Sequence, residues 1–228
     1  MSSGDSPRRS TRIGRPKKTD APTMQRTFGS PPTSIGSRPV VAQLLAELGE
    51  TLRALGCRWY VFGAQAAVAY GKPRMTADVD VTVELGSTKR SALLAALAAA
   101  GFPTRLRLSD ALVDAARLFP LVHEPSTIPV DLLIAGFGLH QDFLERRREV
   151  DIGGVLVPML CPEDLVVTKV LAGRRKDLED IRGVLQEQGA AIGCDQIREL
   201  LAAAEAALAR PGLVRRFDRL RKQARSTP

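Results

Sequence analysis

Residues 61–84 most strongly constrain the fold of this 228-residue chain, because they contain three structural signals in a fixed order. An apolar run ends at Phe62, a glycine follows at position 63, and small residues continue to Tyr70. Residues 78–84 then alternate polar side chains with valine, which is the period of a β-strand with one buried face. This order predicts a strand, a helix that begins at a glycine turn and packs closely on a sheet, and a second strand.

Two carboxylates, Asp78 and Asp80, share the polar face of the second predicted strand. They repel each other unless a cation lies between them, and their oxygen atoms are the ligands that Mg²⁺ prefers. Asp131 follows on a later apolar strand, where an unpaired acid would be costly. The chain has only two histidines, so a metal site must depend on carboxylates. We therefore take these three aspartates as the candidate catalytic and metal-binding residues.

Residues beside the carboxylates suit phosphate binding. A turn at Gly63 and Ala64 would expose backbone N–H groups at the positive end of a helix. Arg74 and Thr76 offer a cation and a hydroxyl between that turn and the first aspartate. The same residues also admit a plainer interpretation, in which the glycine only makes a turn and the other two solvate a loop.

These residues resemble the nucleotidyltransferase superfamily of the DNA polymerase β type. Its signature is an apolar residue, Gly, then Gly or Ser, a helix, and Asp-x-Asp or Asp-x-Glu, with a third carboxylate on a later strand. Gly63, Asp78, Asp80 and Asp131 match these positions. Ala64 departs from the pattern, because it keeps the backbone N–H but lacks the serine hydroxyl. The resemblance covers residues 58–185.

A later helical segment is similar to the Lys…Arg-x-Lys-Asp-x-x-Asp segment of the AbiEii-like branch, which includes toxins of bacterial toxin–antitoxin and phage-defence systems. The matching residues are Lys169, Arg174, Lys176, Asp177 and Asp180. The resemblance implies that the first two approach a triphosphate from the helical side. In the plainer interpretation the lysine extends its stem along an apolar helix face, and the others form surface ion pairs.

The resemblance implies transfer of a nucleoside monophosphate from NTP to an acceptor hydroxyl, with pyrophosphate as the second product. Asp78 and Asp80 would hold two Mg²⁺ ions, for which Mn²⁺ could substitute, and Asp131 would bind the second ion and help to deprotonate the acceptor. The implied acceptor is RNA such as a tRNA end, and the implied protein partner is a cognate antitoxin. Two alternatives stay open: a small-molecule transferase of the aminoglycoside-adenylating kind, and a catalytically silent fold that binds nucleic acid or protein.

The remaining patterns predict an α/β (α+β) fold with a nucleotidyltransferase-type mixed β-sheet flanked by helices, followed by a C-terminal helical lobe. Pro120 restricts one strand to a sheet edge, and Ser87 or Thr88 would cap a helix that ends at Gly101. Predicted strands cover residues 59–62, 78–84, 118–123 and 128–134, with a hairpin over 149–159. Predicted helices cover residues 41–55, 63–70, 88–101, 163–172, 176–188, 195–209 and 213–224.

Charge and composition divide the chain into three parts. Residues 1–38 are predicted to be a disordered basic tail, residues 39–160 a catalytic domain, and residues 161–228 a helical lobe with a basic end. Residues 14–18 also resemble an AT-hook core, which enters the DNA minor groove. The first 38 residues hold eight Arg and Lys against two Asp, and residues 210–228 hold seven against one. Basic ends suit a polyanionic partner, or serve only to keep the chain soluble.

Nothing in the sequence indicates a membrane or an oxidising compartment. The longest apolar stretch, residues 93–102, is too short to cross a bilayer, and the N-terminus has no apolar signal region. Cys57, Cys161 and Cys194 are scattered without CxxC spacing. We therefore expect a cytoplasmic protein without disulfides or a zinc site.

Overall fold

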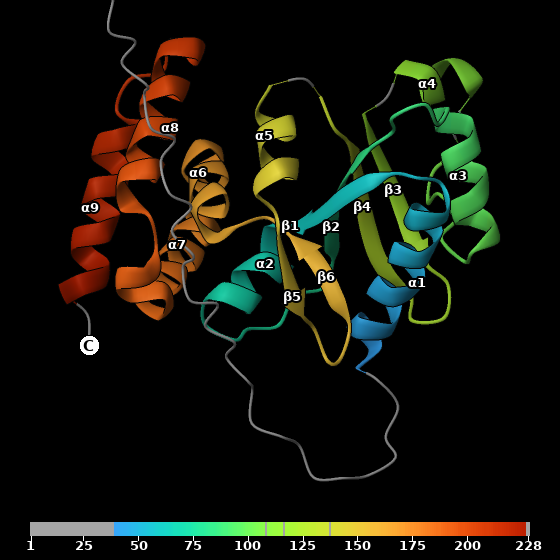
Figure 1. Ribbon diagram of the computed structural model, residues 1–228, viewed down its shortest axis with the longest axis horizontal. Helices are drawn as coiled ribbons and strands as arrows, with labels where there is room; N and C mark the ends of the chain where they lie inside the picture. The colour runs from blue at the N-terminus through green and yellow to red at the C-terminus, as the bar shows by residue number, and fades with distance from the viewer. Residues whose placement is uncertain (1–38, 108, 116, 137, 227–228) are drawn as a thin grey trace, which may run out of the picture. The chain divides into compact units, whose positions relative to one another are not determined.

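A six-stranded mixed sheet forms the centre of the protein in a computed structural model that describes residues 39–226 except 108, 116 and 137 (Figure 1). The strand order is β3-β4-β2-β1-β6-β5. The strands are β1 (Arg58–Phe62), β2 (Val79–Glu84), β3 (Leu118–His123), β4 (Ile128–Ile134), β5 (Arg148–Asp151) and β6 (Leu156–Met159). Because β2 is antiparallel to β1 and parallel to β4, the predicted mixed α/β fold is confirmed.

Nine α-helices and one short 3₁₀-helix accompany this sheet in the described part of the chain. Five of the α-helices precede the last strand: α1 (Val40–Ala54), α2 (Gly63–Tyr70), α3 (Arg90–Ala99), α4 (Asp110–Ala115) and α5 (Leu139–Arg146). The others follow it: α6 (Pro162–Ala172), α7 (Arg175–Gln188), η1 (Gly189–Ala191), α8 (Cys194–Leu208) and α9 (Leu213–Ser226).

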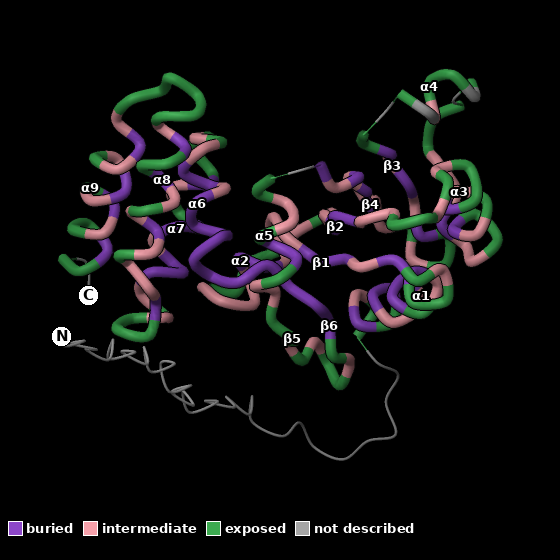
Figure 2. Tube along the Cα trace, turned by 45° about the horizontal axis from the view of Figure 1, so that its top comes forward, coloured by how far each residue is buried: buried purple, intermediate pink, exposed green. Residues whose placement is uncertain are grey.

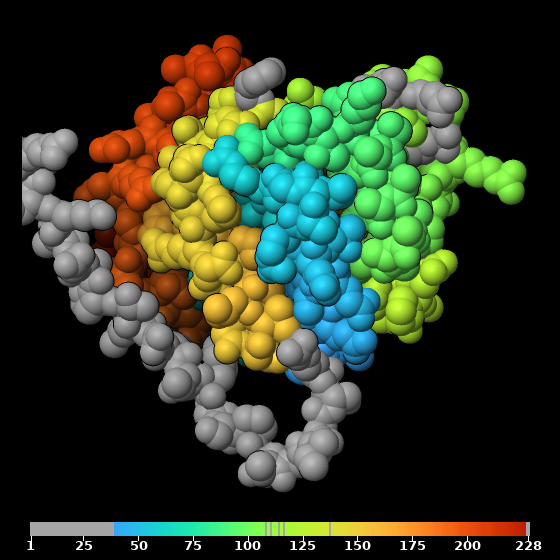
Figure 3. All heavy atoms as spheres, turned by 45° about the vertical axis from the view of Figure 1, so that its right-hand side comes forward, coloured from blue at the N-terminus to red at the C-terminus, as the bar shows by residue number. Residues whose placement is uncertain are grey.

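The two faces of β2 have different environments, as its alternating sequence predicted. Val79, Val81 and Val83 are fully buried, and they share a sheet face with Trp59 of the neighbouring strand. Helix α1 covers this face, since Gly49 lies directly against the Trp59 ring. Figure 3 shows α1 and α3 side by side on the surface. The opposite face of β2 therefore presents its polar residues.

Helices α6 to α9 pack into one assembly that shares its core with the sheet. Helix α6 is buried along most of its length and contacts α2, α7 and α8 (Figure 2). A single hydrophobic cluster runs from the valines of β2 to Phe217 and Leu220 of α9. At the proposed boundary between residues 39–160 and 161–228 the chain changes from strands to helices, but the hydrophobic core continues through both parts. The division into domains stays a prediction.

Three details differ from the sequence-based expectations. Helices α4 and α5 were not predicted, and Phe143 of α5 packs edge-on against Tyr60 on the polar face of the sheet. The predicted helix cap at Ser87 or Thr88 is wrong, since α3 starts at Arg90 without a side-chain cap. The Thr88 hydroxyl instead donates a hydrogen bond to the Leu55 carbonyl, 3.1 Å away, and so links the start of this segment to α1.

Three other expectations concern the edge strand, the N-terminal tail and membrane-spanning helices. Strand β3 lies at the sheet edge, as Pro120 predicted. The predicted tail and the AT-hook-like residues lie outside the described residues. Within the described part of the chain, no helix is both long and apolar enough to cross a membrane.

Candidate active site

Two of the three candidate carboxylates lie directly beside each other in the sheet. Asp80 of β2 and Asp131 of β4 are register partners on neighbouring parallel strands, which places their Cα atoms about 5 Å apart on one sheet face. Asp78 immediately precedes β2. The fold therefore gathers all three candidate catalytic residues, although Asp131 lies about fifty residues further along the chain.

The turn at Gly63 approaches Asp80 so closely that only glycine fits there. Its φ is +66°, and a Cβ atom at this position would lie 1.8 Å from Asp80 Oδ2. The backbone N–H of Ala64 donates a hydrogen bond to the Asp80 carboxylate. The start of α2 and the carboxylate on β2 thus form one local unit, which explains why the chain needs a glycine before this helix.

The surroundings of Asp80 disfavour its negative charge. Burial raises the pKa of this carboxyl group, and the negative charges of Asp78 and Asp131 raise it further. The Ala64 N–H and the positive charge of Lys169 act in the opposite direction. A cation bound among the three carboxylates would relieve this repulsion.

The donor chemistry fits a divalent cation that prefers oxygen ligands, but the side chains are not closed around one. Among the described residues, no three His, Cys, Asp or Glu side chains are grouped as a metal site. The Thr76 hydroxyl donates to Asp78 Oδ1 over 3.1 Å, and Asp131 Oδ1 faces a guanidinium. The backbone nevertheless places two of the carboxylates in register on one sheet face, where both strands offer oxygen ligands of the kind a divalent cation prefers.

Two of the predicted phosphate-binding cations are held by carboxylates of α7. Arg74 makes a two-point ion pair with Asp180, with N–O distances of 2.8 and 3.0 Å. Lys169 Nζ lies 2.7 Å from Asp180 Oδ2 and 3.5 Å from Asp177 Oδ1, and the lysine side chain is only 6% exposed. Burial would raise the pKa of Asp180, but the hydrogen bonds from Arg74 and Lys169 hold it below its ordinary value.

Arg174 is the predicted cation that remains most accessible. Its Nε lies 2.9 Å from Asp177 Oδ2, yet the side chain is 61% exposed. The hydrogen bond with Asp177 is the main cause of the raised pKa of Arg174, and the negative charge of Asp80 adds a smaller contribution. The structure therefore leaves the Arg174 side chain exposed while Asp177 holds it, whereas Lys169 is buried within the same network.

Arg105 is a residue of this site that we did not predict from the sequence. Its Nη2 donates to Asp131 Oδ1 at 2.7 Å. Residues 105–107 read as an ordinary polar loop, and no local pattern connects them with a strand that begins more than twenty residues later. Only the pairing of strands brings the two side chains together.

Known structures with low sequence identity share the fold of this protein. The solution structure of the antibiotic-resistance factor ANT(2'')-Ia has 16% identity and a TM-score of 0.54, covering 74% of this chain and 93% of that chain. Its crystal structure with adenylyl-2''-tobramycin has 15% identity and a TM-score of 0.53, covering 75% and 99%. An antigenic nucleotidyltransferase-like protein from Paracoccidioides brasiliensis has 18% identity and a TM-score of 0.47, covering 78% and 92%.

A search of curated proteins finds no significant match. One family model matches residues 41–221, which is most of the chain and contains every candidate site residue. The chain therefore belongs to the DUF6036 family, whose description is nucleotidyltransferase of unknown function.

Proposed function

We propose that this nucleotidyltransferase transfers a nucleoside monophosphate from NTP to a hydroxyl group of its acceptor, using Asp78, Asp80 and Asp131. The observation that carries the proposal is the side-by-side position of Asp80 and Asp131 against the Gly63 turn. A surface strand whose acids had no function would require neither the close contact between Gly63 and Asp80 nor the pairing of Asp80 with Asp131. The geometry of the site does not support assigning the protein to the AbiEii-like branch in particular.

The three carboxylates would have different roles. Asp78 and Asp80 would bind Mg²⁺, and Asp131 would contribute an oxygen to a second ion and accept the proton of the acceptor hydroxyl. Two Mg²⁺ or Mn²⁺ ions would supply positive charge to the attacking and leaving oxygens. The acceptor oxygen forms a bond to the α-phosphorus, the bond to the β-phosphate oxygen breaks, and pyrophosphate leaves.

The nucleotide phosphates would lie between the Gly63–Ala64 turn and the exposed tip of Arg174. The positive end of α2 and the guanidinium both favour negative charge there. We propose that Lys169 and Arg74 act indirectly, because both are held by Asp180. Thr76 would orient Asp78 through its hydroxyl.

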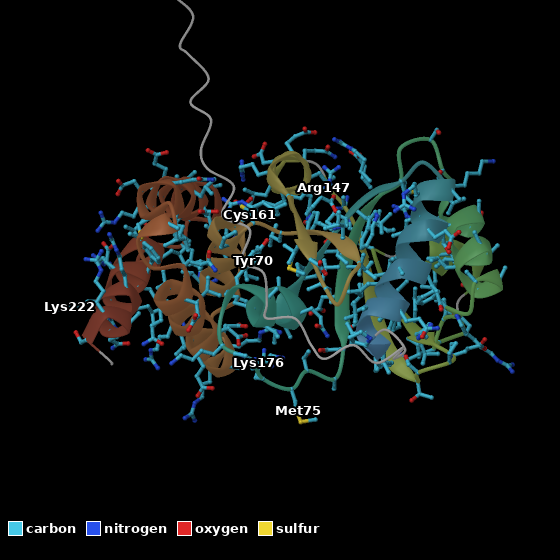
Figure 4. The ribbon with its side chains drawn as sticks, turned by 60° about the horizontal axis from the view of Figure 1, so that its bottom comes forward. Tyr70, Met75, Arg147, Cys161, Lys176 and Lys222 are labelled. Atoms are coloured by element: carbon cyan, nitrogen blue, oxygen red, sulfur yellow. The ribbon has the colours of Figure 1, made fainter. Side chains whose placement is uncertain are left out.

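We propose RNA as the acceptor, supported by a basic surface on α9. Leu213, Phe217 and Leu220 of this helix are buried in the core, and Asp218 is its one acid. Arg215, Arg219, Lys222 and Arg225 are exposed, and Figure 4 shows Lys222 pointing away from the helix bundle. A hollow of about 480 Å³ beside this helix is bordered by Lys72, Arg221 and Arg225. The basic surface consists of Lys72, Arg215, Arg219, Arg221, Lys222 and Arg225. Such clusters suit phosphodiester backbones.

A small cationic acceptor is the second candidate. The fold is shared with a structure that contains an adenylylated aminoglycoside, and residues 39–209 carry more acidic than basic side chains. An acidic surface would attract such a molecule. The antitoxin partner and the cytoplasmic location stay predictions, which neither the site nor the basic surface addresses.

The proposal is tested by incubating the full chain with Mg²⁺, each α-³²P-labelled NTP in turn, and either total bacterial RNA or a panel of aminoglycosides. The double variant Asp78→Ala/Asp80→Ala should transfer no label. Asp195→Ala removes an exposed carboxylate from α8 and serves as the matched control, which should behave like the wild type.

Each outcome has a distinct meaning. Label on RNA that weakens in Arg221→Ala/Arg225→Ala, with unchanged NTP binding, supports the RNA acceptor. Label on an aminoglycoside alone selects the second candidate. If no acceptor is labelled and NTP binds equally with and without Mg²⁺, the transferase proposal fails and a silent binding fold remains.

A further inference from the structure

A short extended segment adds to the edge of the sheet and carries Arg105. The Arg105 N–H donates to the Pro120 carbonyl of β3 at 2.7 Å, and the Val122 N–H donates to the Pro103 carbonyl at 3.0 Å. Thr104 and Leu121 form an antiparallel bridge between these two contacts. The segment therefore runs alongside β3 as a short outer strand.

This pairing places Arg105 in the same row of the sheet as the candidate carboxylates. In antiparallel order, a bridge between Thr104 and Leu121 sets Arg105 opposite Pro120. Pro120 is the register partner of Asp131, which is in turn the partner of Asp80. Directly opposed residues share a sheet face, so Arg105 lies on the same face as Asp131, two strands away, and its side chain contacts that carboxylate.

We propose that Arg105 is the counter-ion of Asp131 when no divalent cation is bound, and that it competes with the metal for this carboxylate. The inference rests on the proposed function, because it requires a metal bound by Asp131. Arg105 Nη2 lies 2.7 Å from Asp131 Oδ1. In the part of the chain described here, no other side chain pairs with Asp131.

The physical reason is the clustering of negative charge. Asp78, Asp80 and Asp131 repel one another, and the pair with Arg105 neutralises one of them without a metal. The guanidinium side chain is 40% exposed and Asp131 is 34% exposed, so the pair is accessible to solvent and can open. Arg105 therefore lowers the affinity of the free protein for an ion at Asp131.

The test measures Mn²⁺ binding to the metal-free full chain by isothermal titration calorimetry and by the Mn²⁺ electron paramagnetic resonance signal, without any turnover. We expect Arg105→Gln to bind Mn²⁺ about tenfold more tightly, equivalent to about 1.4 kcal/mol. Arg105→Lys keeps the charge and should stay close to wild type. Arg107→Gln removes a cation from the same segment that has no contact with Asp131, and it should also stay close to wild type.

The outcomes separate this inference from the proposed function. If Arg105→Gln binds Mn²⁺ no more tightly than the wild type, or gains no more than Arg107→Gln, the competition is refuted while the metal site stands. If neither the wild type nor Arg105→Gln binds Mn²⁺, the metal site and the inference both fail. Asp131→Asn in the Arg105→Gln background should abolish the gain, and thermal melting of each variant shows that it is folded.

Discussion

Replacement of Gly63 by alanine tests the link between the glycine turn and the carboxylate site. Gly56 offers a matched control, because its φ of +67° is nearly the same as the +66° of Gly63, but no atom lies within 4 Å of a Cβ built there. At Gly63 the added Cβ would meet Asp80 Oδ2 at 1.8 Å, although Cβ contacts below 3.0 Å essentially do not occur. The Asp80 carboxylate must therefore move by more than 1 Å.

The magnitudes follow from these contacts. An alanine in left-handed backbone conformation lowers the free energy of unfolding by about 1–2 kcal/mol. Alanine also makes the unfolded chain less flexible than glycine does, which regains about 0.4–1 kcal/mol. Gly56→Ala should therefore lose about 1 kcal/mol. Gly63→Ala should lose the same amount plus the hydrogen bond from Ala64 to a charged carboxylate, about 1.5–3 kcal/mol, for a total of about 3 kcal/mol. With about 2–4 °C per kcal/mol, Tm should fall by about 3 °C and about 9 °C.

Urea and thermal unfolding measure these losses, and Mn²⁺ binding and NMP transfer measure the site. A displacement of 1 Å at a reacting group costs about 100-fold in rate, so Gly63→Ala should lose transfer activity while Gly56→Ala keeps it. In an Asp80→Ala background the extra cost at Gly63 should largely disappear, since the clashing carboxylate is gone. Equal stability losses in the two glycine variants, or wild-type Mn²⁺ binding by Gly63→Ala, would refute the reasoning.

Three further predictions concern the carboxylates. Asp180→Asn leaves buried Lys169 short of a partner and should lower the free energy of unfolding by about 3 kcal/mol in urea titrations; a loss below about 1 kcal/mol would show that the network is not stabilising. The folded-state pKa of Asp180 lies below its ordinary value. The wild type should therefore have its full excess in free energy of unfolding over this variant above about pH 5, and this excess should decline as the pH falls through the folded-state pKa. Unfolding curves from pH 7 to pH 2.5 would show this decline. Asp80→Asn removes an acid whose pKa burial and neighbouring charges raise, so the metal-free variant should melt higher than wild type at pH 7 while losing NMP transfer; a lower Tm would contradict the proposed charge repulsion.

The local patterns of the sequence were sufficient to locate the centre of the candidate site. Alternation in residues 78–84 predicted one buried and one polar face for β2, and the structure buries the three valines completely. The glycine before α2 predicted a turn at the start of a helix, which the structure has, whereas its close approach to Asp80 was not predicted and its role in phosphate binding stays a prediction. Periodicity and backbone sterics act over a few residues, so they can be recognised without knowledge of the fold.

Side-chain partners that are far apart in the chain depended on the tertiary structure. Arg74 pairs with Asp180 across 106 positions, and Arg105 reaches Asp131 through the pairing of a sheet edge with β3. Lys169 was open to two interpretations from sequence, and its burial beside Asp180 decided how it is held. The sequence determined which residues could carry charge and where the chain must turn. Only the packing of strands and helices decided which charges meet, because a sequence pattern does not specify which distant segments become neighbours.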